Sequence, residues 1–204
     1  MRKFFIIVVF FSWMCVSVVN YDSAEIKEKT LNKRFAGYFE GGRRREEIST
    51  CYGTSVQQYT WGKFAGNAQM GYGISKNFEL GGQFGGEFGK EKKQGDDSYF
   101  TGGLYLLPYF KIGGKIKNIN FASKAAFGGG PYFIENSFGF LPLGYADFML
   151  GFFAPEKLTI YGGINLFSYR FGVNLNFNNF SLLGQINFLE KNYNSIKIGA
   201  GYKF

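Results

Sequence analysis

Apolar residues recur at every second position in successive segments between Phe64 and Phe204. A period of two residues is typical of β-strands that have one apolar and one polar face. In one segment, Tyr169 and Phe171 share a face, whereas Arg170 lies on the other. Nine such segments can be counted, at 63–74, 77–88, 100–112, 119–127, 145–152, 158–166, 169–177, 180–188 and 196–204. The pattern predicts an all-β protein.

The charged residues within these segments all fall on the polar face. A Lys or Arg that faces lipid costs about 2–4 kcal/mol at the middle of a bilayer, whereas the lumen of a barrel tolerates charge. A soluble β-sandwich also alternates, but the uncharged stripe favours a face that contacts lipid. The charged residues are Lys63, Glu79, Glu87, Lys111, Lys124, Asp147, Arg170, Lys197 and Lys203. We expect the first eight of them to form a charge network in the lumen.

Aromatic residues gather where the expected strands turn. Tyr72 and Phe78 bracket one turn, and Phe177 and Phe180 bracket another. Rings at one level on several strands are typical of the aromatic girdle at a membrane interface. Pro108 lies on the apolar face and has no N–H for the strand ladder, so we expect a β-bulge there.

The number of strands follows from closure of the barrel. An open edge would leave unpaired backbone groups in hydrocarbon, and a single-chain bacterial barrel has an even number of strands. We therefore expect a tenth strand before Tyr59, at Arg34–Glu40, followed by an outer loop at 41–58 that carries Arg43–Arg45. The sequence predicts an antiparallel up-and-down transmembrane β-barrel of ten strands. Eight strands are the alternative, if the region 158–177 has been divided too finely.

The lengths of the connections suggest how the barrel is oriented. If the last strand runs into the periplasm, the short connections at 75–76, 113–118, 154–157 and 178–179 all fall on the periplasmic side. The longer connections at 90–98, 128–144 and 190–194 then fall outside. Short periplasmic turns and longer outer loops are typical of such barrels.

The first residues have the layout of a secretory signal. Met1, Arg2 and Lys3 form a positive region, and 4–11 is apolar. We expect a signal peptide at 1–24, a charged irregular segment at 25–54 that holds the candidate first strand, and an outer-membrane barrel at 55–204.

The cleavage site of this signal is open to two interpretations. Cleavage after Ala24 would follow a small residue, although Asp22 stands where a small residue is preferred. Cys15 is the alternative, as a candidate lipid-anchor site, although the residues before it depart from a lipoprotein box. A membrane-spanning helix is disfavoured, because roughly 16 apolar residues fall short of the ~20 required.

The last eight residues resemble the C-terminal signal of bacterial outer-membrane β-barrels. That signal has a polar residue, a Gly two positions later, and aromatic or apolar residues at the antepenultimate and final positions. Lys197, Gly199, Tyr202 and Phe204 match this pattern. The resemblance implies recognition by the barrel-assembly machinery, with Phe204 as its main determinant, and a location in the cell outer membrane. Residues from about 59 to 204 resemble the small outer-membrane β-barrel class as a whole and no single named family.

Composition argues against enzymatic chemistry. The chain has no His. The outer-membrane enzymes that this class resembles all depend on His as a base or as the partner of a base: the phospholipases, the lipid A deacylases and palmitoyltransferases, and the omptin proteases. Cys15 and Cys51 lie on either side of the expected processing point, so they offer neither a disulfide nor a metal site. Glu79 and Glu87 are roughly 26 Å apart along a strand, too far for a catalytic pair. We expect no enzyme, no cofactor and no metal.

The formal net charge of +8 suggests an anionic partner. Lys and Arg are scattered and form no dense stripe, so we expect no nucleic acid and favour the lipid bilayer and lipopolysaccharide. The favoured function is a structural or surface-interaction barrel with a lumen largely filled by polar side chains. The alternatives are a narrow pore or small-solute channel, which small lumen residues such as Gly81 and Gly85 would permit, and a secreted soluble β-barrel that binds a hydrophobic ligand.

Overall fold

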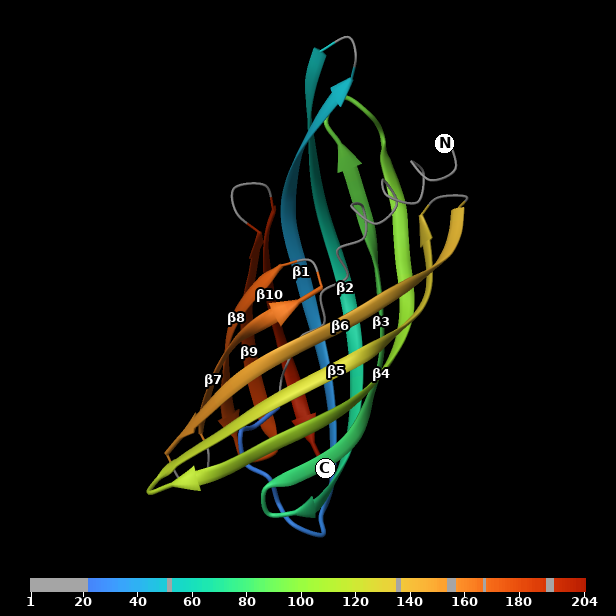
Figure 1. Ribbon diagram of the computed structural model, residues 1–204. Helices are drawn as coiled ribbons and strands as arrows, with labels where there is room; N and C mark the ends of the chain where they lie inside the picture. The colour runs from blue at the N-terminus through green and yellow to red at the C-terminus, as the bar shows by residue number, and fades with distance from the viewer. Residues whose placement is uncertain (1–21, 51–52, 135–136, 154–156, 167, 190–192) are drawn as a thin grey trace.

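The computed structural model describes residues 22–50, 53–134, 137–153, 157–166, 168–189 and 193–204 (Figure 1). Ten strands each pair with their neighbours in sequence, and β1 pairs with β10 to close the barrel. The strands are β1 Leu31–Thr50, β2 Gly53–Ser75, β3 Phe78–Lys93, β4 Ser98–Ile116, β5 Ile119–Ile134, β6 Ser137–Phe152, β7 Leu158–Asn165, β8 Tyr169–Phe177, β9 Phe180–Leu189 and β10 Tyr193–Lys203. The predicted ten-stranded antiparallel barrel is confirmed. The eight-stranded alternative is wrong, because β7 and β8 are separate strands that pair with each other.

The first strand is longer than expected. It continues into the expected outer loop at 41–58 as far as Thr50, and β2 occupies this region from Gly53 onward. The two strands stay paired from Leu31↔Tyr72 to Thr50↔Gly53. The alternation persists through the basic run, since Arg44 is buried while Arg43 and Arg45 are exposed. The expected loop was wrong because the charges on both faces concealed a strand that extends above the apolar band. The barrel therefore begins at Leu31.

Glycines explain why another expected loop, at 128–144, is also mostly strand. β5 runs to Ile134 and β6 starts at Ser137. A Cβ on Gly130 would lie 2.1 Å from the carbonyl oxygen of Leu104, so glycine is required here for close packing of neighbouring strands. The third expected outer connection, 90–98, shortens in the same way, because β3 reaches Lys93.

The connections divide the barrel into two ends. The turn end, at the bottom of Figure 1, carries the tight links from β2 to β3, from β4 to β5 and from β8 to β9. Lys117 and Asn178 have positive φ there, as tight β-hairpin turns require. At the opposite, hairpin end, the end of β1 and the start of β2 project farthest (Figure 1). The expected connections at 154–157 and 190–194 lie largely outside the described residues.

The bulge expected at Pro108 is absent. The register between β4 and β5 is the same at Leu106↔Gly129 as at Tyr109↔Ala126, and Pro108 also stays in register with Gly82 of β3. The strand therefore accommodates the missing N–H without an extra residue. A register shift occurs instead between Gly73 and Ser75 of β2.

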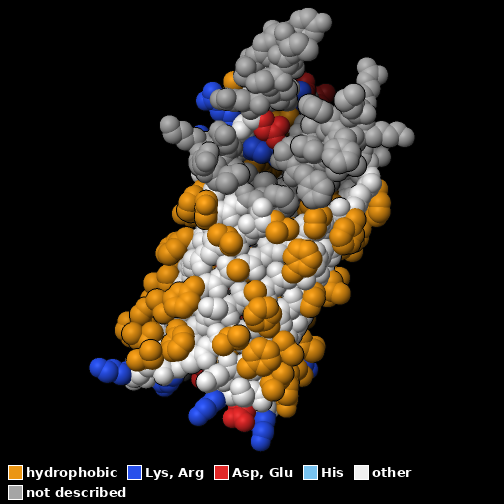
Figure 2. All heavy atoms as spheres, in the orientation of Figure 1, with side chains coloured by type: hydrophobic (Ala, Val, Ile, Leu, Met, Phe, Trp, Pro, Cys, Tyr) orange, Lys and Arg blue, Asp and Glu red, His pale blue; other side chains and the backbone are white. Residues whose placement is uncertain are grey.

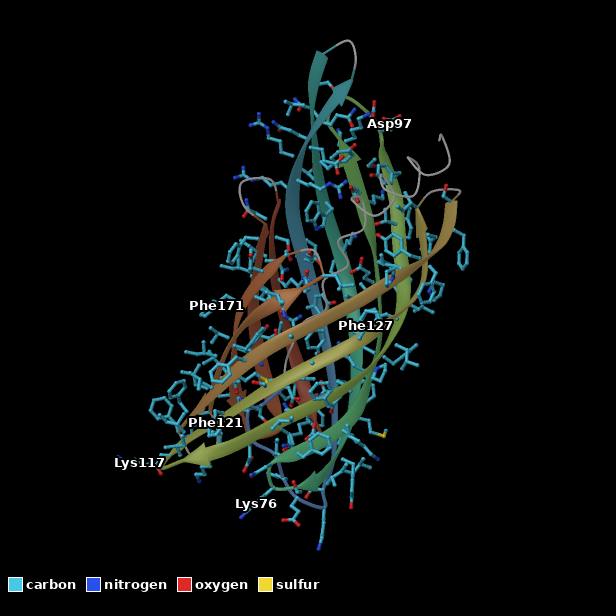
Figure 3. All side chains as sticks on the ribbon, in the orientation of Figure 1. Lys76, Asp97, Lys117, Phe121, Phe127 and Phe171 are labelled. Carbon is cyan, nitrogen blue, oxygen red and sulfur yellow. The ribbon has the colours of Figure 1, made fainter. Side chains whose placement is uncertain are left out.

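The two faces of the wall have opposite chemistry. Large apolar side chains cover the outside, and Phe127 and Phe171 point away from the barrel with 65% and 49% of their surface exposed (Figures 2 and 3). The charged residues predicted for the polar face lie inside, except for the half-buried Lys203 at the turn end. Within the described part of the chain, no helix is long and apolar enough to cross a membrane.

Candidate functional site

The charged residues of the expected lumen network lie buried inside the barrel. Lys63 pairs with Glu87 at 3.0 Å, Lys111 with Glu79 at 3.4 Å, and Arg170 with Asp147. Lys197 pairs at 2.9 Å with Glu40. All eight predicted members, including Lys124, are buried. The alternation explains this network, because each residue sits on the inward face of its strand.

The centre of the network is a residue that the sequence analysis assigned to the signal peptide. The carboxylate of Asp22 lies 3.1 Å from Arg34 of β1, 3.4 Å from Lys111 of β4 and 3.3 Å from Lys124 of β5. Gln69 of β2 donates a hydrogen bond of 3.0 Å to the same group. One carboxylate thus joins side chains from four strands.

The residues that follow Asp22 are also held by the wall. Arg34 Nη2 donates to Ser23 Oγ at 2.7 Å, and Lys111 Nζ donates to the backbone oxygen of Ser23 at 3.3 Å. Asn174 of β8 donates to the backbone oxygen of Asp22 at 3.2 Å. Ala24 packs in a cluster with three buried residues, Ala122, Met149 and Tyr161. Polar and apolar contacts together fix this short segment, 22–24, inside the barrel.

The chain leaves the lumen at the turn end through a close contact with β2. Lys29 N donates to Gly73 O at 2.7 Å, and Gly73 N donates to Thr30 O at 3.2 Å. A Cβ on Gly73 would lie 2.0 Å from the backbone oxygen of Lys27. Gly73 is therefore required for this approach, and its register shift falls at the same place.

Neighbouring cations set the ionisation of Asp22, which precedes the membrane-spanning strands. Burial alone would raise its pKa, but Lys111, Arg34 and Lys124 hold the pKa of this carboxyl well below its ordinary value. Asp22 is therefore charged at neutral pH and offsets part of the positive charge around it.

Tyrosines fill the space that small residues leave in the lumen. A Cβ on Gly81 would lie 2.5 Å from the ring of Tyr109, and one on Gly85 would lie 2.4 Å from the hydroxyl of Tyr105. Gly71 and Gly103 are closed off in the same way, by Tyr109 and Tyr132. These four lumen glycines therefore make room for tyrosine rings.

Tyrosines of the lumen also contact the buried cations. Lys124 Nζ lies 4.1 Å from the centre of the Tyr109 ring, and Arg170 Cζ lies 3.9 Å from that of Tyr145. The hydroxyl of Tyr109 also donates to Glu79 at 2.8 Å. Cation–π contacts and hydrogen bonds together compensate for part of the cost of burying these charges.

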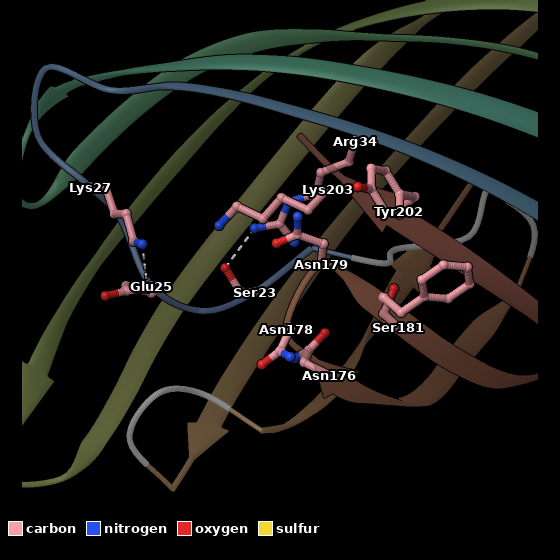
Figure 4. A pocket seen from close by; sticks show the side chains of 11 residues that line it. Ser23, Glu25, Lys27, Arg34, Asn176, Asn178, Asn179, Ser181, Tyr202 and Lys203 are labelled. Carbon is pink, nitrogen blue, oxygen red and sulfur yellow. Dashed lines mark hydrogen bonds and ion pairs between the residues drawn. The ribbon is translucent and has the colours of Figure 1, made fainter.

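A small cavity of about 140 Å³ lies at the turn end (Figure 4). Its lining includes Ser23, Arg34, Asn176 and Lys203. The Ser23–Arg34 hydrogen bond forms part of its wall. Ser23, Glu25 and Lys27 all line the cavity, so the segment that precedes β1 forms one side of it.

The residues of the predicted assembly signal divide between the two faces. Lys197 is inside, while Tyr202 and Phe204 are outside with 37% and 68% of their surface exposed. Their rings pack edge to face, with centroids 4.8 Å apart. Gly199 gives room for Tyr38 of β1, since a Cβ there would lie 2.6 Å from Tyr38 Cβ. Their role in assembly stays a prediction, and Cys15 lies outside the described residues.

The outside of the hairpin end carries a cluster of exposed cations. Arg43 of β1 and Lys92 of β3 both flank Thr60 of β2 in the strand register. They are therefore about two strand spacings, or roughly 10 Å, apart. Arg45 lies two residues after Arg43 on β1, Lys90 lies two residues before Lys92 on β3, and both are also exposed. We call these four residues, Arg43, Arg45, Lys90 and Lys92, the basic surface.

Sequence reasoning missed four members of the lumen network, Asp22, Arg34, Glu40 and Arg44. Arg34 and Glu40 belong to the expected first strand, and their even spacing places them on one face; that spacing is the signal that could have identified them. Arg44 was hidden in a run of three arginines. Asp22 had no such signal, because it lies before the alternating region and reaches the lumen only through the path of the chain.

Comparisons with known proteins give distant structural likenesses and no family. Neither a scan against family models nor a search of curated proteins gave a match. An outer-membrane channel from Pseudomonas putida F1 has 12% identity and a TM-score of 0.46, with 93% of this chain and 100% of that chain covered. The NalP translocator domain from Neisseria meningitidis has 11% identity and a TM-score of 0.42, with 100% and 95% covered. Ail of Yersinia pestis has 13% identity and a TM-score of 0.34, with 87% and 100% covered.

The location follows from the architecture. A closed antiparallel barrel with an apolar exterior and a charged interior is the form in which outer-membrane proteins span their bilayer. The wall has this form (Figure 2), and the protein belongs in the outer membrane. The alternative of a soluble barrel with its apolar face inside is wrong, because that face points outward.

Proposed function

We propose that the protein is a non-conducting outer-membrane barrel that acts through its outer surface, in a structural or surface-interaction role. The observation that carries this proposal is the filled lumen. Lys111, Lys197 and Gln83 have no exposed surface, and the lumen glycines are covered by tyrosine rings. A solute would have to displace both these rings and residues 22–24.

Planar-bilayer recording tests whether the lumen is closed. We expect the refolded full-length protein to give no stable single-channel steps under conditions in which a general porin does. Residues 22–24 close the lumen from the side of the turn end, so no ion pathway should open at moderate voltage. Stable steps of uniform size would overturn the proposal in favour of the narrow pore.

The partner that we propose for the outside is the phosphorylated glycolipid of the outer leaflet, lipopolysaccharide. The basic surface supports this choice, because it lies just beyond the apolar residues Phe39, Phe64 and Phe88 of the same three strands. Cations near an anionic membrane surface contribute about 1 kcal/mol each. Cross-strand cations roughly 10 Å apart suit a headgroup with more than one phosphate.

Binding of purified lipopolysaccharide in detergent tests this partner. We expect the triple variant Arg43→Gln, Lys90→Gln, Lys92→Gln to bind on the order of 100-fold more weakly, since three contributions of about 1 kcal/mol are lost. The control is Lys33→Gln, Lys76→Gln, Lys115→Gln, which removes three exposed cations at the turn end. Equal loss in the two variants, or undiminished binding of dephosphorylated lipopolysaccharide, would refute the proposed site.

A further inference from the structure

The contacts of Asp22–Ala24 bear on how the protein matures. Each residue of this segment has a partner on the wall: Asp22 has three cations, Ser23 has Arg34 and Ala24 has an apolar niche. The partners come from strands far apart in the sequence, including β1, β5 and β8. The wall therefore offers a matching partner to each of three successive side chains: the carboxylate of Asp22, the hydroxyl of Ser23 and the methyl group of Ala24.

Cleavage after Ala24 would remove all three residues. The side chains of Arg34, Lys111 and Lys124, of which 8%, 0% and 0% is exposed, would then share one carboxylate fewer. Glu79 contacts Lys111 at 3.4 Å, and this one carboxylate would have to offset more of the buried positive charge. Buried charges that lose their partners are strongly destabilising. The wall thus requires a carboxylate at the position of Asp22.

We infer that the signal peptide is cleaved on the N-terminal side of Asp22, so that Asp22–Ala24 stay in the mature protein as the internal counterion and packing partner of the barrel. Signal peptidase hydrolyses the peptide bond with water. The leader leaves with the new carboxylate, and the mature chain gains the new amino terminus. This processing differs from the expected cleavage after Ala24. It does not depend on what the outer surface binds.

The intact mass of the protein purified from outer membranes tests the inference directly. We expect a mass that includes Asp22 and lacks Met1–Lys3. A chain that begins at Glu25 or later, or that still begins at Met1, would overturn the inference and leave the proposed surface role untouched. The measurement uses the unaltered protein, so it does not depend on whether a variant folds.

Substitution of Asp22 tests the counterion role separately. We expect Asp22→Asn to lower the temperature at which the folded band converts to the unfolded band on electrophoresis by about 5 °C or more. The matched control is Glu25→Gln, because Glu25 is half-buried and pairs with the exposed Lys27 at 3.8 Å. Adding Lys124→Gln to Asp22→Asn should restore part of the loss, since one buried cation is removed. Equal conversion temperatures for Asp22→Asn and Glu25→Gln would overturn the counterion role.

Discussion

The barrel has a tall wall and a short wall, and their strands differ in how far they exceed the length needed to cross a membrane. The tall wall, β1–β6, has strands of 16 to 23 residues. The short wall, β7–β10, has strands of 8 to 11 residues. A tilted strand needs about 9–11 residues to cross the hydrocarbon. The short wall is therefore just long enough to span the membrane, whereas the tall wall has a surplus that projects at the hairpin end (Figure 1).

The surplus follows different rules from the spanning part. Outward positions of the spanning part are apolar on both walls, but those of the surplus include Arg43 and Lys92. Inside, Arg44 pairs with Glu46 at 2.9 Å and with Glu91 at 3.3 Å, and Arg44 also lies 4.6 Å from the Tyr59 ring. The comparison indicates that lipid determines the outer face of the spanning part, and that water permits charge on both faces above it.

The sharpest way to break this comparison is to place one Lys on each part. Ile186 of β9 and Val56 of β2 are outward apolar residues with similar exposure, 49% and 45%. We expect Ile186→Lys to abolish assembly, because a lipid-facing Lys costs about 2–4 kcal/mol at mid-membrane. Val56→Lys should assemble normally. The measurement is the amount of heat-modifiable folded barrel in outer membranes. Equal amounts for the two variants would show that the surplus and the spanning part do not differ.

A second test compares a buried ion pair with one in the projecting part. The side chains of Asp147 and Arg170 have 0% exposure. We expect Asp147→Asn to cost about 3–5 kcal/mol, because Arg170 loses its carboxylate in the lumen. Glu46 is 16% exposed and Arg44 keeps Glu91, so Glu46→Gln should cost about 1 kcal/mol or less. Urea unfolding of the refolded variants gives both values. Similar losses would mean that burial does not distinguish the two pairs.

How much the sequence could predict differs between the two walls. The short wall was predicted nearly to the residue, because its outer face is uniformly apolar and its polar face holds only isolated charges such as Arg170. The surplus of the tall wall was mistaken for loops. In water, nothing requires the outer face to stay apolar, so charges occupy both faces around Arg43–Arg45 and the apolar–polar pattern of the sequence is lost there. The glycines at 128–130 interrupt the pattern for another reason, the close packing of neighbouring strands. Strands that face lipid can therefore be recognised in the sequence by their apolar alternation, whereas strands that project into water cannot.

The lumen showed the same limit. Inward residues such as Lys63 and Glu87 were predictable from alternation, although their partners were not, because pairing depends on register between strands. Asp22 escaped prediction altogether. A residue outside the strands can reach the lumen only through the three-dimensional path of the chain, and no local pattern encodes that path.

Acid pH provides a third test, because Asp22 joins the two walls. It contacts Arg34, Lys111 and Lys124 on the tall wall, and Asn174 of the short wall donates to its backbone oxygen. Burial would raise its pKa, but the cations lower the pKa well below its ordinary value. A carboxyl group whose pKa is lower in the folded protein than in the unfolded protein stabilises the fold at any pH above its unfolded pKa, about 4. That stabilisation is lost as the pH falls further.

We therefore expect the conversion temperature to stay level between about pH 8 and 5 and to fall below about pH 4. Asp22→Asn should start lower and lose less over the same acid range, because it has no carboxylate to protonate at this position. Measuring the two proteins in parallel separates Asp22 from the other carboxylates. An identical acid slope for both would mean that Asp22 does not hold the walls together.

The smallest effect on the barrel should come from removing the projecting hairpin. Arg45 faces Gln58 in the register, so residues 46–57 can be replaced by Asn-Gly, a two-residue turn that suits the twist of adjacent strands. We expect the shortened protein to assemble with a conversion temperature close to that of Glu46→Gln, because Glu46 is removed and the other residues removed lie beyond the lipid-facing part. The basic surface is kept, so binding of lipopolysaccharide should change little. A marked loss of folded barrel would mean that the surplus is needed to form the tall wall, and the division between spanning and projecting parts would then have to be abandoned.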